Sequence, residues 1–108
     1  MQHLLIIETQ APFASDARLP GLALALEAAR AGRPVSLWLM QDATEALRMR
    51  NDAGLEDCCT HPGIAVFADD FALAQRGIAL DRWPDVTAGA MADLAALLLD
   101  RSVKPIWH

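Results

Sequence analysis

The sequence predicts an α/β domain in which helices cover both faces of a mostly parallel sheet of four or five strands. Short, almost uninterrupted apolar runs are typical of strands that are covered on both faces, and they occur at residues 3–8, 35–40 and 64–67. Apolar residues recur at helical spacing between these runs. Connections of this length between apolar strands favour parallel pairing. We interpret residues 1–108 as one domain.

The first strand, residues 3–8 (HLLIIE), leads into a loop at residues 9–19. Three turn-forming residues mark this loop: Pro12, Ser15 and Asp16. A helix follows from about Pro20, because the first turn of a helix tolerates the missing N–H of proline. Gly32 ends it.

The second strand, residues 35–40 (VSLWLM), is followed by a short loop in which Asp42 caps a helix from Ala43 to about Arg50. Residues 51–62 are polar and contain a glycine, so we predict a loop with about one helical turn there.

After the third strand, either Asp69 or Asp70 caps a short helix that runs through Arg76 and ends at Gly77. Residues 81–86 contain a proline and are interpreted as a surface connection.

A strong helical stripe of alanine and leucine covers residues 87–100, with Thr87 as the predicted N-cap. The last strand is residues 103–107 (VKPIW). Pro105 cannot donate a hydrogen bond to a neighbouring strand, which favours a strand that lies at the edge of the sheet or is interrupted.

The composition excludes several classes of function. The net charge of −5 and the lack of a Lys/Arg block argue against nucleic-acid binding. No apolar run approaches the roughly 20 residues of a membrane-spanning helix, and no basic segment precedes the first apolar run, so we expect a cytoplasmic protein. No glycine-rich fingerprint follows the first strand, so we predict no dinucleotide, flavin or other cofactor.

Four segments, in this order, resemble the DsrE-like proteins, a family that includes sulfur-relay and sulfur-oxidation subunits. They are LLIIETQAPF, VSLWLMQDAT, GIAVFADDFALAQRGI and AGAMADLAALLLDRSVKPIWH, which together span most of the chain. The resemblance implies a flavodoxin-like layered sheet and assembly into homotrimers or homohexamers, with itself or with related sulfur-relay subunits as partners.

In the sulfur-relay members, a cysteine just after the third strand carries sulfur as a persulfide. Counting back from Arg76 and Gly77, that position falls at about Asp69, and the second cysteine of some members falls at about Ala72. Neither residue is a cysteine. A carboxylate cannot accept sulfane sulfur, because this chemistry needs a nucleophilic thiolate.

Cys58, Cys59 and His61 are the candidates for a relocated sulfur acceptor. A thiolate on a flexible loop could be assisted by His61 as a base or a cation. These residues offer three ligands to a soft metal, but no second cluster completes a zinc shell, so we predict no metal site. The alternative is that both thiols are half buried and have no role, since free cysteine usually behaves as a small hydrophobic residue.

Polar side chains that follow the predicted strands form a second candidate site, because ligands of open α/β sheets bind beyond the carboxyl ends of the strands. They are Glu8, Thr9, Gln10, Gln41, Asp42, Asp69 and Asp70. Asp69 and Asp70 could bind a cation or act as acid and base. The alternative is that one of these two caps the next helix while the other is solvated, and that the remaining residues serve in turns and caps.

Two hypotheses of function remain open. The first is a DsrE-like protein of sulfur trafficking, which either passes sulfur through Cys58 and Cys59 or acts as a partner-binding subunit. The second is a non-catalytic homo-oligomer that binds a small ligand at the strand ends. Trp83 and Trp107 lie in segments predicted to be exposed, which favours subunit contacts in either case.

Overall fold

The computed structural model describes residues 2–11, 20–48 and 53–107. The predicted loop with Pro12, Ser15 and Asp16, and the predicted end of the second helix at Arg50, lie outside these ranges.

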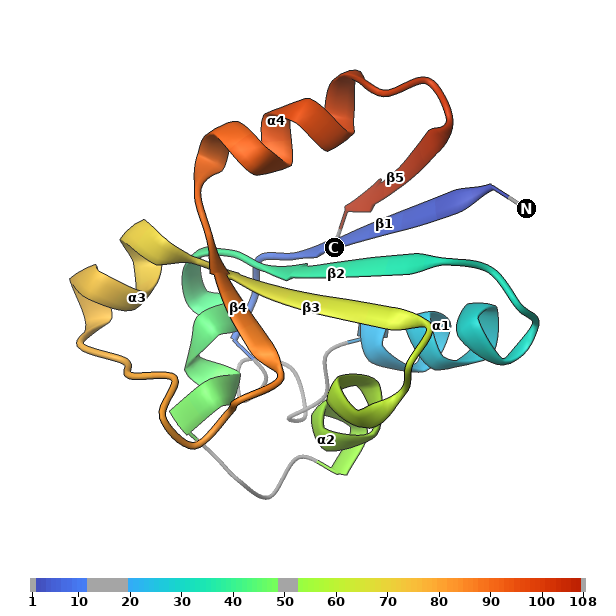
Figure 1. Ribbon diagram of the computed structural model, residues 1–108. Helices are drawn as coiled ribbons and strands as arrows, with labels where there is room; N and C mark the ends of the chain where they lie inside the picture. The colour runs from blue at the N-terminus through green and yellow to red at the C-terminus, as the bar shows by residue number, and fades with distance from the viewer. Residues whose placement is uncertain (1, 12–19, 49–52, 108) are drawn as a thin grey trace.

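A sheet of five parallel strands forms the centre of the molecule, in the order β4-β3-β2-β1-β5 (Figure 1). The strands are β1 (His3–Glu8), β2 (Val35–Leu39), β3 (Ile64–Asp69), β4 (Val86–Gly89) and β5 (Val103–Trp107). This confirms the predicted fold class, a parallel α/β sheet of flavodoxin-like architecture. Of the two alternatives predicted from Pro105, the structure shows the edge position, because β5 is the last strand of the sheet.

The helical segments lie on both faces of the sheet (Figure 1). They are α1 (Pro20–Arg30), the 3₁₀-helix η2 (Gln41–Arg48), α2 (Ala53–Thr60), α3 (Asp70–Arg76) and α4 (Met91–Leu99). The chain from β1 to β4 steps from each strand to its neighbour, so its right-handed crossovers place their helices on one face. The connection from β4 to β5 returns across the sheet and places α4 on the opposite face.

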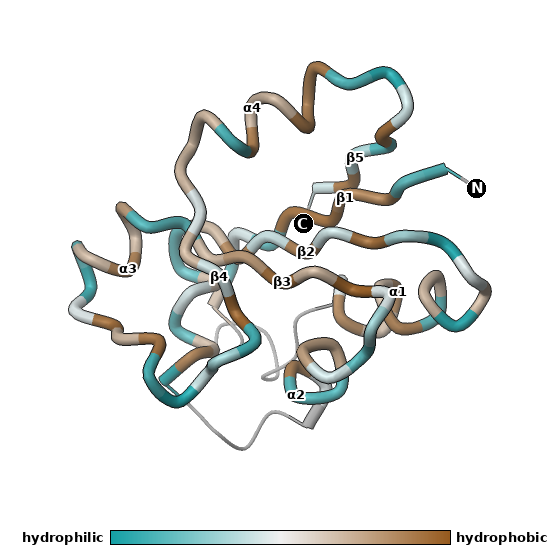
Figure 2. The backbone as a smooth tube through the Cα atoms, in the orientation of Figure 1, coloured by the Kyte–Doolittle hydropathy of each residue, from teal (hydrophilic) through white to brown (hydrophobic). Residues whose placement is uncertain are grey.

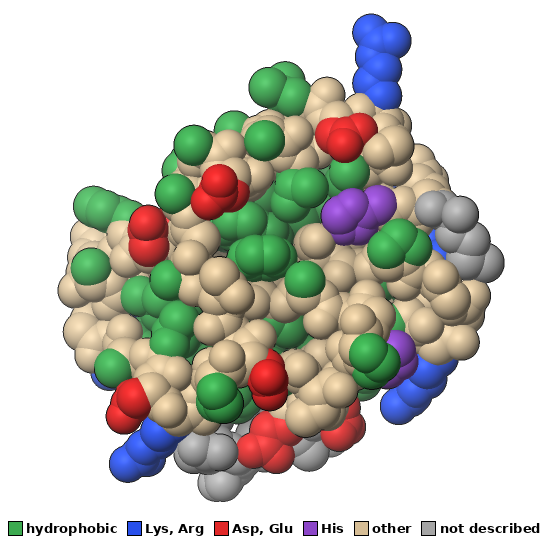
Figure 3. Space-filling view, in the orientation of Figure 1, with side chains coloured by type: hydrophobic (Ala, Val, Ile, Leu, Met, Phe, Trp, Pro, Cys, Tyr) green, Lys and Arg blue, Asp and Glu red, His purple; other side chains and the backbone are tan. Residues whose placement is uncertain are grey.

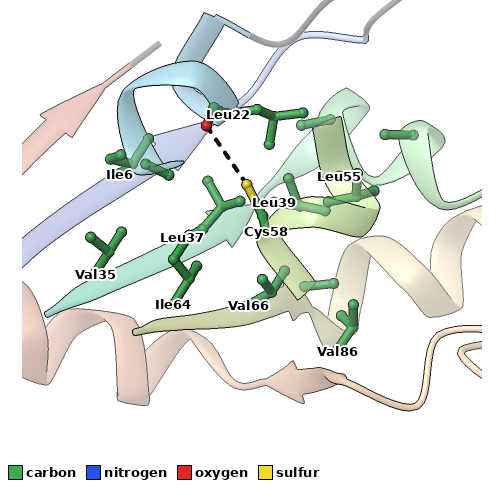
Figure 4. Close-up of a cluster of buried hydrophobic side chains, with 14 of the residues drawn as sticks. Ile6, Leu22, Val35, Leu37, Leu39, Leu55, Cys58, Ile64, Val66 and Val86 are labelled. Atoms are coloured by element: carbon green, nitrogen blue, oxygen red, sulfur yellow. Dashed lines mark hydrogen bonds between the residues drawn. The ribbon is translucent and has the colours of Figure 1, made fainter. Parts of the chain in front are cut away.

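The alternation of side chains along the strands separates two apolar clusters. The larger cluster joins Leu4 and Ile6 of β1 to the faces of α1, η2 and α2 (Figure 4). The smaller cluster joins Leu5 and Ile7 to Trp38 and to Leu94, the buried residue of α4. Figure 2 shows the apolar character of the strands that separate these clusters. The first face is therefore well covered, whereas the second is covered mainly by one helix.

The segment between α3 and α4 differs from the prediction. Residues 86–89 form β4, although residues 81–86 were expected to be a surface connection and Thr87 a helix cap. Ala90 is the N-cap of α4 instead. The strand is short and lies at the sheet edge, so only Val86 and Gly89 are buried and the apolar signal is weak.

Two further predictions are wrong. The cysteine pair lies in α2 rather than in a loop. Trp83 is buried rather than exposed, because its ring packs in the larger apolar cluster. Its indole N–H donates a hydrogen bond to the carbonyl oxygen of Leu47 at 2.8 Å. Trp107 is exposed, as expected.

Candidate functional site

At the carboxyl ends of the neighbouring strands β3 and β4, the chain continues to opposite faces of the sheet. Asp69 of β3 lies in register with Gly89 of β4, and α3 and α4 then begin on different sides. Such a switch point is the usual place for a ligand in an open parallel sheet. The side chains at this edge therefore decide whether a site exists there.

Asp69 performs a structural task at this edge. Its side chain is buried, and Oδ2 accepts a hydrogen bond from the backbone N–H of Ala72 at 3.2 Å, which caps α3. Asp70 is exposed in the first turn of the same helix. One aspartate caps and the other is solvated, as the structural alternative predicted. The positions where the DsrE-like resemblance expects cysteines thus hold a capping carboxylate and the buried methyl group of Ala72.

Glu8 ends β1 and is fully buried. Its Oε1 accepts a hydrogen bond from the backbone N–H of Gly21 in the first turn of α1. A carboxylate at a helix N-terminus is favourable, because the free N–H groups there carry partial positive charge. Thr9 is half buried and Gln10 is exposed. Glu8 therefore fixes the start of α1 to the end of β1.

Gln41 and Asp42 follow β2 and are both exposed. Gln41 has a left-handed backbone (φ 50°), and its carbonyl oxygen accepts a hydrogen bond from the hydroxyl of Thr44 at 2.7 Å. Asp42 lies inside η2 rather than capping a helix that begins at residue 43. Its Oδ1 is 2.7 Å from Nη2 of Arg76, which ties η2 to α3.

Cys58 belongs to the apolar core. Its side chain is fully buried among the residues shown in Figure 4, and its thiol donates to the carbonyl oxygen of Leu22 at 3.7 Å. A sulfur donor or acceptor protein cannot reach this thiol without opening α2.

Cys59 is half buried and lines a surface pocket of about 230 Å³. Burial, together with the negative charges of Asp85 and Glu56, raises the pKa of this thiol to about 11. The neutral thiol therefore dominates at physiological pH, whereas sulfur transfer needs the thiolate.

His61 follows α2, and its ring has a local structural partner. Nδ1 accepts a hydrogen bond from the backbone N–H of Gly63 at 2.9 Å, which closes the turn before β3. The three residues proposed from the sequence thus have separate structural settings: Cys58 lies in the apolar core, Cys59 in a pocket wall and His61 in a turn.

The pocket itself was not predicted. Residues from α2 and from the connection before β4 line it: Glu56, Cys59, Thr60, Arg82, Trp83, Pro84 and Asp85. Recognising α2 as a helix would have placed the first three on one face, but their contact with residues 82–85 is a tertiary feature.

In the described ranges, no group of three or more His, Cys, Asp or Glu side chains is arranged to hold a metal ion. No described helix has the length and apolarity needed to cross a membrane.

Comparison with known proteins supports the fold. No family model matches the chain, and no curated protein matches it in sequence. Among solved structures, the YchN protein of E. coli, which has a DsrE-like fold, superposes with a TM-score of 0.80 at 22% identity and covers 100% of both chains. At this identity the likeness establishes a shared fold and leaves the activity open.

Proposed function

We propose that this chain is a non-carrier subunit of the DsrE-like type, which serves sulfur trafficking by assembling with further copies of itself through α4. The exposure of this apolar helix is the observation that supports the proposal. The thiol that carries sulfur would then belong to a related sulfur-relay subunit and not to any copy of this chain.

The sequence of α4, MADLAALLL, is apolar on every side except at Asp93 (Figure 2). Leu94 is its buried residue, whereas Met91, Leu98 and Leu99 are exposed, Leu99 by 84%. A helix that is apolar all round is normally buried on all sides. Burying a leucine side chain stabilises a complex by about 1.5–3 kcal/mol, so covering this helix is strongly favoured.

A further exposed apolar side chain lies on the same face of the sheet as α4. Trp107 of β5 pairs in register with Ile7, so its side chain points to the sheet face that α4 covers, and 58% of it is exposed. Figure 3 shows hydrophobic side chains gathered across this side of the molecule. Clustered exposed apolar side chains of this kind mark interaction sites.

A second copy is the occupant that this surface fits best. The outer side of α4 carries small residues and one leucine: Ala92, Ala95, Ala96 and Leu99. Small residues allow two helices to approach closely, and an apolar patch without basic residues is complementary to itself about a two-fold axis. In an antiparallel contact, Asp100 of one copy would lie near the N-terminus of α4 in the other, where a carboxylate is stabilising.

The thiols of the chain support the non-carrier role. Cys58 is enclosed in the core, and Cys59 has a raised pKa with two carboxylates nearby. Asp69 occupies the position at which the resemblance expects the sulfur acceptor, and it is engaged as a cap.

Light scattering coupled to size-exclusion chromatography tests the assembly. We expect a mass that is a multiple of 11.7 kDa for the wild type and a monomer for Leu99→Lys. Phe71→Lys is the matched control, because Phe71 is 70% exposed but lies on α3. A wild type that remains monomeric at all concentrations, or a control that dissociates equally, contradicts the proposal.

A sulfur carrier that uses Cys59 is the second candidate, favoured by the position of this thiol in an open pocket. In that reaction the thiolate attacks the outer sulfur of a donor persulfide, the donor leaves as a thiol, and Cys59 becomes a persulfide. Intact mass after exposure to a persulfide donor tests it. The gain of one sulfur atom, lost in Cys59→Ser but kept in Cys58→Ser, would establish a carrier and overturn the non-carrier role.

A further inference from the structure

Two methionines lie in the described ranges, and their surroundings differ. Met40 is buried in the smaller apolar cluster, whereas the side chain of Met91, the first residue of α4, is 57% exposed. A methionine sulfur is oxidised to the sulfoxide where an oxidant can reach it, and it need not lose a proton first. Of these two sulfurs, the one open to an oxidant in solution is therefore that of Met91.

Met91 belongs to the apolar surface of α4 through which self-association is proposed above. Ala95 and Leu98 follow it at spacings of four and seven residues, so the three exposed side chains share one stripe of the helix. The side chains of α4 carry no hydrogen-bond donor, since they are those of Met, Ala and Leu apart from the carboxylate of Asp93. A polar oxygen on this stripe would therefore meet no donor side chain from the α4 of a second copy.

The two thiols are poor competitors for an oxidant. Cys58 is fully buried, and the pKa of Cys59 is raised to about 11. Peroxides react with the thiolate, which is a minor form of Cys59 at neutral pH. Oxidation is therefore expected at Met91 before either cysteine.

We propose that Met91 is an oxidation site at which a peroxide weakens self-association through α4, an inference that rests on the assembly proposed above. The sulfur lone pair attacks one oxygen of the peroxide, the O–O bond breaks and an S–O bond forms. With hydrogen peroxide the second oxygen leaves as water, so the sulfur is oxidised by two electrons and the peroxide is reduced. The sulfoxide oxygen is a hydrogen-bond acceptor, and covering it without a donor opposes association.

Oxidation and assembly oppose each other. In the associated pair the sulfur would be covered by the second copy, so a peroxide reaches it mainly in the dissociated copy. Each oxidised copy associates less, so oxidation draws protein out of the assembly by mass action. We expect the dissociation constant of the oxidised protein to rise about tenfold or more, the effect of a buried acceptor without a partner.

Treatment with hydrogen peroxide at neutral pH, followed by catalase and then dithiothreitol, tests the proposal. The reductant restores reversibly oxidised thiols and leaves the sulfoxide, and peptide mass mapping locates the added oxygen. We expect light scattering to show the assembled mass before treatment and a mass closer to that of one chain after it. Methionine sulfoxide reductases should then restore the assembly.

Met91→Leu is the matched control, because it removes the sulfur and keeps an apolar side chain, while Met1, Met40 and Met49 remain. It should assemble like the wild type and keep its mass after the same treatment. Met91→Gln, a polar replacement of similar length, should weaken assembly without any oxidant. Dissociation of treated Met91→Leu, or a wild type that is oxidised at Met91 and stays assembled, overturns the proposal.

The oxidation rate separates this proposal from the assembly on which it rests. Met91 should be oxidised more slowly in the assembled wild type than in the monomeric Leu99→Lys. Equal rates in an assembled wild type would place the sulfur outside the interface and overturn the oxidation site alone. An untreated wild type that is monomeric at all concentrations would overturn the assembly, and its control by Met91 with it.

Discussion

Single glycines and carboxylates fix the positions of neighbouring elements. A Cβ atom at Gly89 would lie 2.5 Å from Cη2 and 2.7 Å from Cζ3 of Trp38, whose ring also stacks on Phe67 with centroids 4.8 Å apart. A Cβ atom at Gly21 would overlap the carboxylate of Glu8. These contacts join residues far apart in the sequence. The need for glycine at positions 21 and 89 therefore could not be predicted from the sequence alone.

Gly89→Ala should lower the free energy of unfolding by about 1–3 kcal/mol, the usual cost of overpacking a core. Denaturant unfolding measures this change. Combining Gly89→Ala with Trp38→Phe should cost less than the sum of the two single changes, since the smaller ring makes room for the methyl group. Ala88→Ser, at the exposed neighbouring position, should change stability by less than about 0.5 kcal/mol. Strict additivity of the pair would refute the contact.

Cys59 should make stability fall in the alkaline range. Its folded pKa of about 11 exceeds the ordinary value of 9.0, so the folded state holds the proton more tightly than the unfolded chain. The contribution is therefore complete below pH 9 and is lost as the pH rises toward 11.

Unfolding measurements between pH 8 and pH 11 test this effect. The sequence has no tyrosine and a single lysine, Lys104, but the thiol of Cys58 also ionises in this range in the unfolded chain, so the contribution of Cys59 is read from the difference between the wild type and Cys59→Ser. Cys59→Ser should flatten the decline, whereas Lys104→Gln should leave it. An unchanged slope in the serine variant would show that the thiol does not cause it.

At the scale of elements, the capping of α3 was readable from the sequence and the identities of α2 and β4 were not. An aspartate before a short apolar helix that ends in Arg-Gly is a local signal, and the structure uses it directly. The segment AGLEDCCT, by contrast, contains glycine, aspartate, cysteine and threonine, all weak helix formers. It is helical because Leu55 and Cys58 pack into the larger cluster, which is a tertiary effect.

Asp69→Ala should lower the free energy of unfolding by about 1 kcal/mol, the usual cost of losing an N-cap. Asp69→Asn keeps an acceptor oxygen and should cost less. Asp70→Ala, in the exposed first turn, is the matched control and should change stability by less than about 0.5 kcal/mol. If Asp69→Ala is neutral, the carboxylate has another role than capping.

At the scale of the whole molecule, the two faces of the sheet are covered unequally, which favours self-association through the less covered face. The sequence indicated the fold class because strand and helix periods alternate along the chain. It did not indicate the pocket, because the residues that line it with Cys59 come from segments about 25 residues apart, and the second segment is held in place by the hydrogen bond from Trp83 to Leu47 of η2. The exposure of α4 was equally hidden, since its sequence is that of a buried helix.

Assembly through α4 should make the thermal midpoint depend on protein concentration, because association favours the folded state by mass action. We expect the midpoint of the wild type to rise over a hundredfold increase in concentration, measured by circular dichroism. The midpoint of Leu99→Lys should be constant over the same range. A midpoint that is constant for both proteins would argue against a coupled folding and association equilibrium.

The position of β5 beside β1 has a consequence for biosynthesis. Val103 pairs with His3, so β1 gains its second neighbour only after almost one hundred further residues have left the ribosome. Until then, the most apolar strand of the sheet presents an open edge, the arrangement that invites intermolecular pairing. The nascent chain is therefore exposed to aggregation until β5 has emerged and paired, and chaperone protection would matter in that interval.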